Sequence, residues 1–297
     1  MSLGAAPGPV ARRTELVTPE PAEALAGLLD IDPPASTDGL PPLWHWVYLL
    51  ERRRESELGP DGHPTRGIPA PPGPGRLRMF AGGRVTAYGL LRFGAEATRS
   101  TRVLRSVEKQ GRSGPLTFVT VRSEVEQEGR LVVAEEQDIV YREAGSTLTG
   151  TRGATPDPRA AADAADAPAP STPASDAPAS EGHRLQLAVD PVLLFRFSAL
   201  TYNAHRIHYD QAYAAAEGYP GLVVHGPLQA LLMGEAVRRS GVPVLGREFA
   251  YRLVAPTYGA QPLTVTTGDG APGVVEASVH DGSGVRTATS TLSRGTR

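Results

Sequence analysis

GYPGLVVHGPLQALLM, residues 218–233, carries the strongest helix signal in the chain. The leucines that follow Pro227 fall at helical spacing, the proline suits a first turn, and Gly241 supplies a stop after two arginines. The pattern therefore predicts a helix from Gly226 to Gly241. The first N–H groups of a helix lack intrahelical partners and carry partial positive charge, so Gly226 is a candidate donor to a developing oxyanion.

Strand-like runs surround this helix in the sequence. They combine β-branched residues, partial alternation of apolar and polar residues, and turn residues between the runs. A helix laid across an antiparallel sheet in each half predicts an α+β architecture built twice. The runs lie at 84–94, 98–110, 115–129 and 131–143 after a helix-like segment at 21–30 and a Trp-rich turn at 40–51, and again at 183–190, 247–258, 261–270, 274–282 and 285–294.

The segment 155–182 separates the two halves and consists almost entirely of Ala, Pro, Asp, Ser and Thr. Such a composition cannot bury enough apolar surface to offset the loss of chain entropy. We predict an N-terminal half with an N-terminal extension over 1–149, a flexible linker over 150–182, and a C-terminal half over 183–297. A short helix over 159–167 is the alternative for the linker, because alanine has a high helix propensity.

Composition argues against several classes of function. The 30 basic and 32 acidic residues nearly cancel, so no overall field draws the protein to nucleic acid or to an anionic membrane. Without cysteine, the chain has no disulfide, no thiolate nucleophile and no cysteine-ligated zinc. No apolar run approaches the ~20 residues of a membrane span, and the first residues lack the apolar block of a signal peptide. We therefore expect a cytoplasmic protein with neither nucleic-acid nor membrane partners.

The stretch TYNAHRIHYD, residues 201–210, combines two histidines, an asparagine and an aspartate. His205 and His208 at i, i+3 could share a helical face and bind zinc, but no HExxH signature or thiolate completes a ligand set, so we expect no metal. A purely structural alternative is that these side chains bond to the backbone in a turn or at a helix start. The third alternative is an acid–base site, because a neutral imidazole accepts a proton near neutral pH.

Together, these two stretches resemble the signature of the MaoC-like, or hydratase-2, enzymes of the hot-dog superfamily. FSALTYNAHRIHYD (197–210) and GYPGLVVHGPLQALL (218–232) are similar to the subgroup that contains mesaconyl-C4-CoA hydratase and type 2 hydroxyacyl-thioester dehydratases. Segments of the first half match too, among them GPDGHPTRGIP (59–69) and EKQGRSGPLTFVTV (108–121). The resemblance covers roughly residues 40–145 and 183–297.

The resemblance implies an α+β double hot-dog fold, in which two antiparallel sheets each wrap around a central helix. The C-terminal half would supply the catalytic groups, and a degenerate N-terminal half would help to shape the acyl-thioester tunnel. The implied reaction is the reversible addition of water to a 2,3-enoyl thioester. No metal or redox cofactor is implied, since the CoA or carrier-protein thioester is part of the substrate. A homodimer is expected by analogy alone.

The resemblance also assigns roles to residues. His208 occupies the catalytic histidine position, and Gly226, eighteen residues later, the oxyanion-donor position. Asn203 stands where most of the superfamily has aspartate, and asparagine cannot accept a proton at neutral pH. It can still hold the water or orient the imidazole. Either His208 acts alone as acid and base, or a second group joins it, with His205 and Asp210 the nearest candidates.

Further polar residues have two interpretations each. His205 serves either the pocket or a structural hydrogen bond, and His225 either contributes to the pocket or bonds to backbone carbonyls. Asp61 and His63 in GPDGHP fit a glycine-rich turn as well as a catalytic role. Tyr209 is expected to be structural.

A negatively charged acyl chain would require an arginine in the substrate-binding site. A carboxylate on the acyl chain needs a cation when it is desolvated, and arginine binds carboxylates bidentately. Arg78, Arg112 and Arg206 are the candidates within the matching segments. Each could instead meet CoA phosphates or lie on the surface, and the sequence does not choose among them.

The first functional hypothesis is a hydratase for a short, branched, dicarboxylic enoyl-CoA of the mesaconyl type. The second is a 3-hydroxyacyl-thioester dehydratase of fatty-acid or polyketide synthesis, which would use the same residues in the reverse direction. A non-catalytic acyl-thioester-binding scaffold is the alternative from another class, because Asn203 departs from the catalytic pattern. A thioesterase is a weaker rival.

Overall fold

The computed structural model describes residues 9–35, 39–71, 76–111, 114–143 and 183–294. Within this part of the chain, ten strands form one antiparallel sheet in the order β1-β3-β4-β5-β2-β7-β10-β9-β8-β6. The first five strands in that order come from the N-terminal half and the last five from the C-terminal half. Their bounds are β1 Ala11–Leu16, β2 Arg76–Ala87, β3 Glu96–Gly111, β4 Gly114–Gln127, β5 Arg130–Glu143, β6 Arg184–Val189, β7 Arg247–Leu253, β8 Gln261–Asp269, β9 Val275–His280 and β10 Arg286–Arg294.

The two halves meet where residues 82–86 of β2 pair with β7. Two glycines in β2 permit this close approach. A Cβ on Gly82 would lie 2.5 Å from the carbonyl oxygen of Tyr251, and a Cβ on Gly83 would lie 2.6 Å from the hydroxyl oxygen of the same tyrosine. Both distances are too short for a real side chain, so glycine lets the strands of the two halves join into one continuous sheet.

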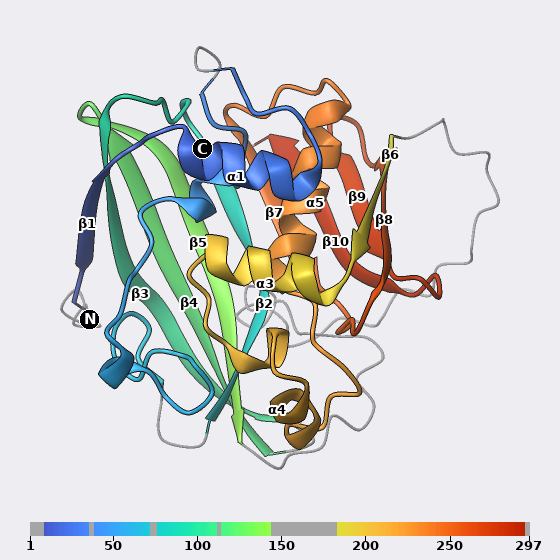
Figure 1. Cartoon of the computed structure of the whole chain (residues 1–297). Coiled ribbons are helices and arrows are strands. Elements are labelled where there is room, and N and C mark those ends of the chain that lie inside the picture. Colours follow the sequence, from blue (N-terminus) through green and yellow to red (C-terminus); the bar gives the residue numbers. More distant parts are fainter. Residues whose placement is uncertain (1–8, 36–38, 72–75, 112–113, 144–182, 295–297) are drawn as a thin grey trace, which may run out of the picture.

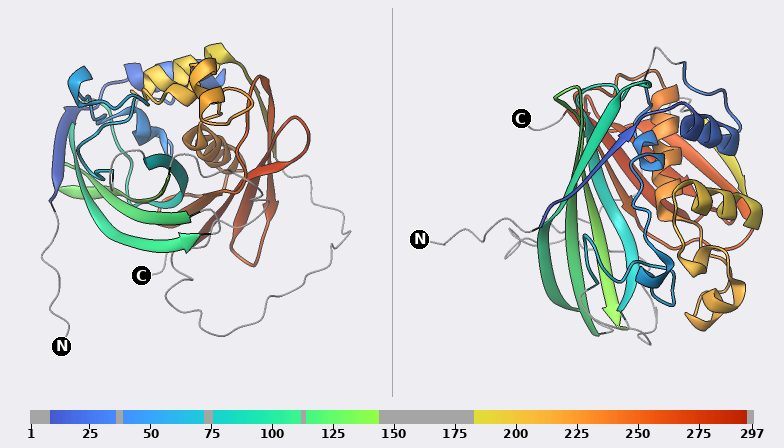
Figure 2. Two further views of the ribbon diagram at one scale, coloured as in Figure 1. Left: turned by 90° about the horizontal axis from the view of Figure 1, so that it is seen from below. Right: turned by 60° about the vertical axis from the view of Figure 1, so that its left-hand side comes forward.

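The longer helices lie on one face of the sheet (Figure 1), and the sheet curves around them (Figure 2). The helix α5 (Gly226–Arg239) is innermost and packs on β8, β9 and β10 as well as on β2 and β7. Its residues 228–237 are all buried. A helix that is enclosed in this way is fixed by packing, so its N-terminus is a rigid position in the fold.

Two further helices lie on the same side of the sheet as α5 (Figure 1 and Figure 2). The helix α1 (Glu20–Leu29) packs on α3 (Pro191–Leu200) and on the short 3-10 helix η1 (Trp44–Val47). The carboxylate of Asp190 caps α3 by accepting a hydrogen bond from the N–H of Leu193 at 2.7 Å. The C-terminal end of α3 leads directly into residues 201–210.

The predicted α+β class and all nine predicted strand regions are confirmed, with shifted ends. Two regions differ from the expectation in detail. The strand expected at 84–94 starts earlier and ends at Ala87, and the Trp-rich turn at 40–51 contains η1, whose Trp44 side chain is buried. The predicted linker over 150–182 lies outside the described residues, so the domain boundaries stay a prediction.

None of the helices in the described ranges has the length and apolar character needed to span a membrane.

Candidate active site

Residues 201–210 form a turn between α3 and the short helix α4 (Gln211–Ala216), with one 3-10 segment, η3 (Arg206–His208). Asn203 and Asp210 fix the path of this turn. The Oδ1 of Asn203 accepts a hydrogen bond from the N–H of His205 at 3.1 Å, and the Oδ1 of Asp210 accepts one from the N–H of Tyr213 at 3.0 Å. Both side chains thus make the local backbone bonds of polar turn residues.

His208 is buried in this turn, and one nitrogen of its ring is tied to the backbone. Its Nδ1 lies 2.7 Å from the carbonyl oxygen of Val223. A carbonyl oxygen can only accept, so Nδ1 carries the proton of the neutral ring and Nε2 keeps its lone pair. Burial lowers the pKa of His208 to about 4, although the Val223 hydrogen bond acts in the opposite direction. At neutral pH the ring is therefore uncharged and can accept a proton at Nε2.

Four imidazole rings stand next to one another in the order His225, His208, His205 and His63. The ring centroids are 3.6 Å apart for the first pair, 5.5 Å for the second and 4.0 Å for the third. Burial, and then the charges of neighbouring imidazoles, lower the pKa of His205 and of His225. Two neighbouring imidazolium charges would repel each other in this buried row, so more than one proton on the row is disfavoured.

Gly226 is the first residue of α5, and His225 is the N-cap residue of that helix. The N–H of Gly226 has no intrahelical partner at this position. A Cβ at residue 226 would lie 3.1 Å from the Cδ1 of Phe80, a side chain that lines the same cavity as Gly226. His208 stacks on His225, the residue that precedes Gly226, and His208 and Gly226 line the same cavity.

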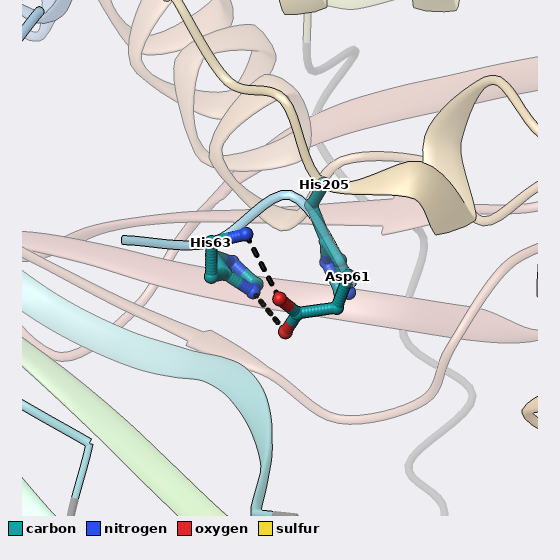
Figure 3. Close-up of side chains that lie close together, drawn as sticks. All are labelled: Asp61, His63 and His205. Carbon is teal, nitrogen blue, oxygen red and sulfur yellow. Dashed lines mark hydrogen bonds and ion pairs between the residues drawn. The ribbon is translucent and has the colours of Figure 1, made fainter. Parts of the chain in front are cut away.

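A turn of the N-terminal half, residues 59–64, docks on the turn that carries His208. The N–H of Arg206 donates to the carbonyl oxygen of Asp61 at 2.9 Å. Figure 3 shows the carboxylate of Asp61 facing both the backbone N–H and the ring of His63, with hydrogen bonds of 3.0 Å and 3.1 Å. His63 in turn lies against the ring of His205. Residues about 145 positions apart in the sequence, 59–64 and 205–208, therefore share one site.

Asp61, His63 and His205 also bring three potential metal ligands within 4.8 Å of one another. The Nδ1 of His63 is already hydrogen-bonded to the Asp61 carboxylate. Burial and, to a smaller degree, the positive charge of Arg78 lower the pKa of both histidines. A metal ion here would face the same arginine charge. These donors fit a hydrogen-bonded acid–base pair better than a ligand set.

A cavity of about 1330 Å³ runs along these groups. Such a volume exceeds the roughly 300–1,000 Å³ typical of small-molecule pockets, so a long substrate such as an acyl thioester can enter it. The predicted site residues that line it are Asn203, His205, His208, Gly226 and Arg78, together with His63 from the docked turn. His225 is fully buried, and its Nε2 lies 2.9 Å from the hydroxyl oxygen of Ser198.

The three candidate arginines lie in different places. Arg78, on β2, lines the cavity, and among the described residues no carboxylate forms a salt bridge with it. Burial lowers its pKa. Arg206 is instead held by the Oδ2 of Asp210 at 2.6 Å, and its guanidinium lies over the ring of Tyr213. Arg112 lies outside the described residues.

The docked turn is the part of the site that sequence reasoning left undecided. The signal that could have identified it is the glycine between Asp61 and His63. Gly62 has a φ of +86°, and a Cβ there would collide with the carbonyl oxygen of Ala204. Only glycine allows both the left-handed backbone and this close approach, so GPDGHP is a turn built to contact another segment.

Comparisons with known proteins agree with this geometry. A family model described as hydroxyacyl-thioester dehydratase type 2 matches residues 43–259. Mesaconyl-C(4)-CoA hydratase of Chloroflexus aurantiacus is 44% identical over 248 residues, which cover 82% of this chain and 81% of that protein.

Solved structures agree on the fold. A MaoC-like dehydratase superposes with a TM-score of 0.63 at 17% identity, covering 96% of this chain and 98% of that chain. A Mycobacterium tuberculosis protein described as having a double hot-dog fold gives a TM-score of 0.53 at 16% identity, covering 97% of this chain and 96% of that one. At such identities the likeness concerns the fold alone, and it confirms the predicted double hot-dog fold.

Proposed function

The chain belongs to the hydroxyacyl-thioester dehydratase type 2 family and is a hydro-lyase that interconverts 2,3-enoyl and 3-hydroxyacyl thioesters; we propose that its substrate is a short, branched, dicarboxylic enoyl-CoA of the mesaconyl type. The identity of 44% to a mesaconyl-C(4)-CoA hydratase supports this substrate class. The structural observation that carries the proposal is Arg78 on the wall of the cavity that holds His208, a cation that forms no salt bridge with any carboxylate of the described residues.

His208 is the proposed acid–base group at the α-carbon. In the dehydration direction its neutral Nε2 removes the α-proton, and in the hydration direction the protonated ring returns it. The Val223 carbonyl holds the tautomer that leaves Nε2 available. Burial of the ring keeps it neutral at physiological pH, because the pKa is lowered to about 4.

Gly226 is the proposed donor to the thioester oxygen. Negative charge gathers on this oxygen as the α-proton leaves or as water adds to the β-carbon. The N–H at the start of α5 is free of intrahelical bonds and lies at the positive end of the helix dipole. Because α5 is buried along most of its length, the donor is held in place before the reaction begins.

Asn203 has a positioning role in this proposal. Its Oδ1 is bonded to the N–H of His205, which leaves its NH₂ group to donate a hydrogen bond into the cavity that Asn203 lines. An amide donor can hold the water oxygen or the substrate hydroxyl, but it cannot transfer a proton at neutral pH. The proton chemistry therefore belongs to the histidines.

Arg78 is the proposed ligand of the substrate carboxylate. In a mesaconyl-type thioester the carboxylate and the methyl branch sit on the β-carbon, so the cation must lie close to the reacting atoms. A carboxylate that enters this partly buried site would form a charge-assisted, bidentate pair with the guanidinium. Arg206 is already paired with Asp210, and it is not needed for this role.

Further arginines on the same cavity favour CoA over a carrier protein as the thioester carrier. CoA brings a diphosphate and a 3′-phosphate, whereas a carrier protein presents one phosphodiester, and arginine is well suited to phosphate. The cavity-lining arginines outside the catalytic region are Arg12, Arg13, Arg52, Arg53 and Arg99. Arg13, Arg52 and Arg53 are paired with glutamates, so Arg12 and Arg99, which form no salt bridge within the described residues, are the cations left for phosphate.

The second candidate function is dehydration of a 3-hydroxyacyl thioester in chain-building synthesis, and the description of the matching family favours it. Both functions use the same groups and differ in substrate and direction of flux. A panel of C4–C6 enoyl and 3-hydroxyacyl thioesters, with and without a β-carboxylate and on CoA or carrier protein, separates them. The proposal expects the highest kcat/KM for carboxylate-bearing CoA thioesters, and a preference for uncharged carrier-protein thioesters would overturn it.

The remaining expectations stay predictions. Hydration is redox-neutral acid–base chemistry, so the proposal requires neither a redox cofactor nor a metal. A homodimer and a cytoplasmic location were expected from the sequence, and both need measurement by light scattering and by fractionation.

A further inference from the structure

We propose that Asp61 and His63 form a second acid–base pair, which serves the oxygen on the β-carbon while His208 serves the α-carbon. This inference rests on the proposed function, because it assigns the second proton transfer of the same reaction. In this proposal His208 of the C-terminal motif and His63 of the N-terminal half act from opposite sides of one substrate.

The reaction needs a second proton transfer that neither Asn203 nor Asp210 of the 201–210 turn is well placed to supply. Loss of water from a 3-hydroxyacyl thioester removes a proton from carbon and adds one to the leaving hydroxyl. Asn203 has no ionisable group. Both oxygens of Asp210 are engaged, Oδ1 with the N–H of Tyr213 and Oδ2 with the guanidinium of Arg206.

The Asp61–His63 pair has the geometry that this task requires. The Oδ2 of Asp61 lies 3.1 Å from the Nδ1 of His63, and its Oδ1 accepts a hydrogen bond from the His63 N–H at 3.0 Å. A carboxylate accepts, so Nδ1 of His63 donates to Asp61 (Figure 3), and we assign Nε2 to the substrate. A half-buried carboxylate that holds an imidazole in this way fixes its tautomer and stabilises the imidazolium form.

The row of rings gives each histidine a position along the substrate. His208 stacks on His225, which precedes the Gly226 amide, so His208 belongs near the thioester carbonyl and the α-carbon. His63 stands at the opposite end of the row, beyond His205. The charge of Arg78, the proposed carboxylate ligand, acts on both His205 and His63, so this end of the row is assigned to the β-carbon. Of these two histidines only His63 is hydrogen-bonded to a carboxylate, and it is therefore the proposed acid.

Electrostatics favour the proton at the His63 end of the row. Burial and the Arg78 charge lower the pKa of His63, whereas the hydrogen bond and charge of Asp61 raise it. Neither His205 nor His208 has a carboxylate among the groups that shift its pKa. When the row holds one proton, Asp61 thus makes His63 the best-stabilised site, with His208 left neutral and ready to act as the base.

The balanced step follows from this starting state. In dehydration the Cα–H bond breaks and its proton goes to Nε2 of His208, while the electron pair forms the Cα=Cβ bond. The Cβ–O bond breaks, and the leaving hydroxyl takes the proton from Nε2 of His63 and departs as water. His208 is then protonated and His63 neutral, and exchange with solvent restores the starting state. Hydration is the reverse sequence.

The test replaces the leaving group. A 3-chloroacyl thioester eliminates chloride, which needs no proton, so it requires the base His208 but no general acid. We expect His63→Gln to lower kcat for dehydration of the 3-hydroxyacyl thioester by about a hundredfold or more, with chloride elimination within about threefold of wild type. His208→Gln should lose both reactions. Asp61→Asn removes the charge but keeps an amide oxygen for the His63 N–H, and it should show the pattern of His63→Gln in weaker form.

Each other outcome overturns the inference. A parallel fall of both reactions in His63→Gln would show that the residue only supports the position of His208, and unchanged rates would show that it has no role. Loss of activity on treatment with a chelator, restored by a divalent cation, would make the cluster a metal site. His280→Gln, on β9, is the matched control for replacing a histidine. A wild-type protein inactive on every thioester of the panel would overturn the proposed function as well, whereas wild-type activity with unaffected variants would overturn this inference alone.

Discussion

His208 and His225 stack face to face, with ring centroids 3.6 Å apart and ring planes inclined by 20°. His225 is the N-cap residue of α5, so the stacking sets the proposed base beside the amide that begins the most enclosed helix of the fold. The ring of His225 is itself fixed, because it is fully buried and contacts Ser198 and Phe197. The base and the oxyanion donor are therefore positioned by one packed unit.

Substitutions at Gly226 separate the role of its N–H from the role of the space around it. Gly226→Ala adds a Cβ that crowds Phe80 but keeps the N–H, whereas Gly226→Pro adds similar bulk and removes the N–H. Proline is tolerated in the first turn of a helix. We expect kcat for Gly226→Pro to fall about 10²- to 10³-fold below that of Gly226→Ala. Steady-state kinetics measure this ratio, and equal rates for the two variants would remove the amide from the mechanism.

Arg78 should determine the preference for a carboxylate. Arg78→Met is expected to lower kcat/KM about tenfold or more for thioesters with a β-carboxylate and to change it little for those without, because a charge-assisted bond is lost. Arg206→Met is the matched control. Its ion pair with Asp210 is exposed, so the substitution should affect both substrate classes alike. Equal losses on both substrate classes for Arg78→Met would contradict the assignment.

Docking of the N-terminal turn can be tested at Gly62. A Cβ there would collide with the carbonyl oxygen of Ala204, and the φ of +86° adds backbone strain. Gly284 has a similar φ of +82° with no atom near its Cβ position, so Gly284→Ala is a control for strain alone. We expect Gly62→Ala to lower kcat roughly tenfold or more by displacing His63, and Gly284→Ala to cost only about 1 kcal/mol of stability. Thermal unfolding of both variants measures the loss of stability, and steady-state kinetics measure the change in kcat.

Stability should rise with pH between about 4 and 6.5. Burial lowers the pKa of His208 from 6.5 to about 4, so in this range the unfolded chain binds a proton that the folded state excludes. The contribution is complete above pH 6.5 and is lost as the pH falls toward 4, with a magnitude on the order of 3 kcal/mol. Urea unfolding at pH 7.5 and pH 5 should show a smaller difference for His208→Gln than for wild type. An unchanged difference would mean that His208 is not buried in its neutral form.

Much of the C-terminal half could be predicted from local pattern. The leucine spacing and flanking glycines placed a helix at 226–241, and the structure has α5 at Gly226–Arg239. The predicted residues His208 and Gly226 lie on one cavity. Local periodicity is informative here because α5 is long and buried on several sides.

The contribution of the N-terminal half could not be predicted in the same way. Nothing in the sequence near Asp61 specifies that its carbonyl will accept a hydrogen bond from Arg206, about 145 residues later. The choice among the arginines also depends on tertiary structure, since pairing with Asp210 occupies Arg206 and leaves Arg78 for the cavity. The strand β1 and the helix α3 were not predicted, because neither has a pronounced periodic pattern of its own.

The most direct measurement is the rate of interconversion of an enoyl-CoA and its 3-hydroxyacyl-CoA by wild type and by His208→Gln, together with the binding of a saturated acyl-CoA to both. We expect kcat to fall about 10²- to 10⁴-fold in the variant, because a general base at the α-carbon is lost. Binding of the saturated analogue should change by less than about threefold, since the imidazole acts mainly in the transition state. A variant that turns over as fast as wild type would contradict the assignment of His208 as the base.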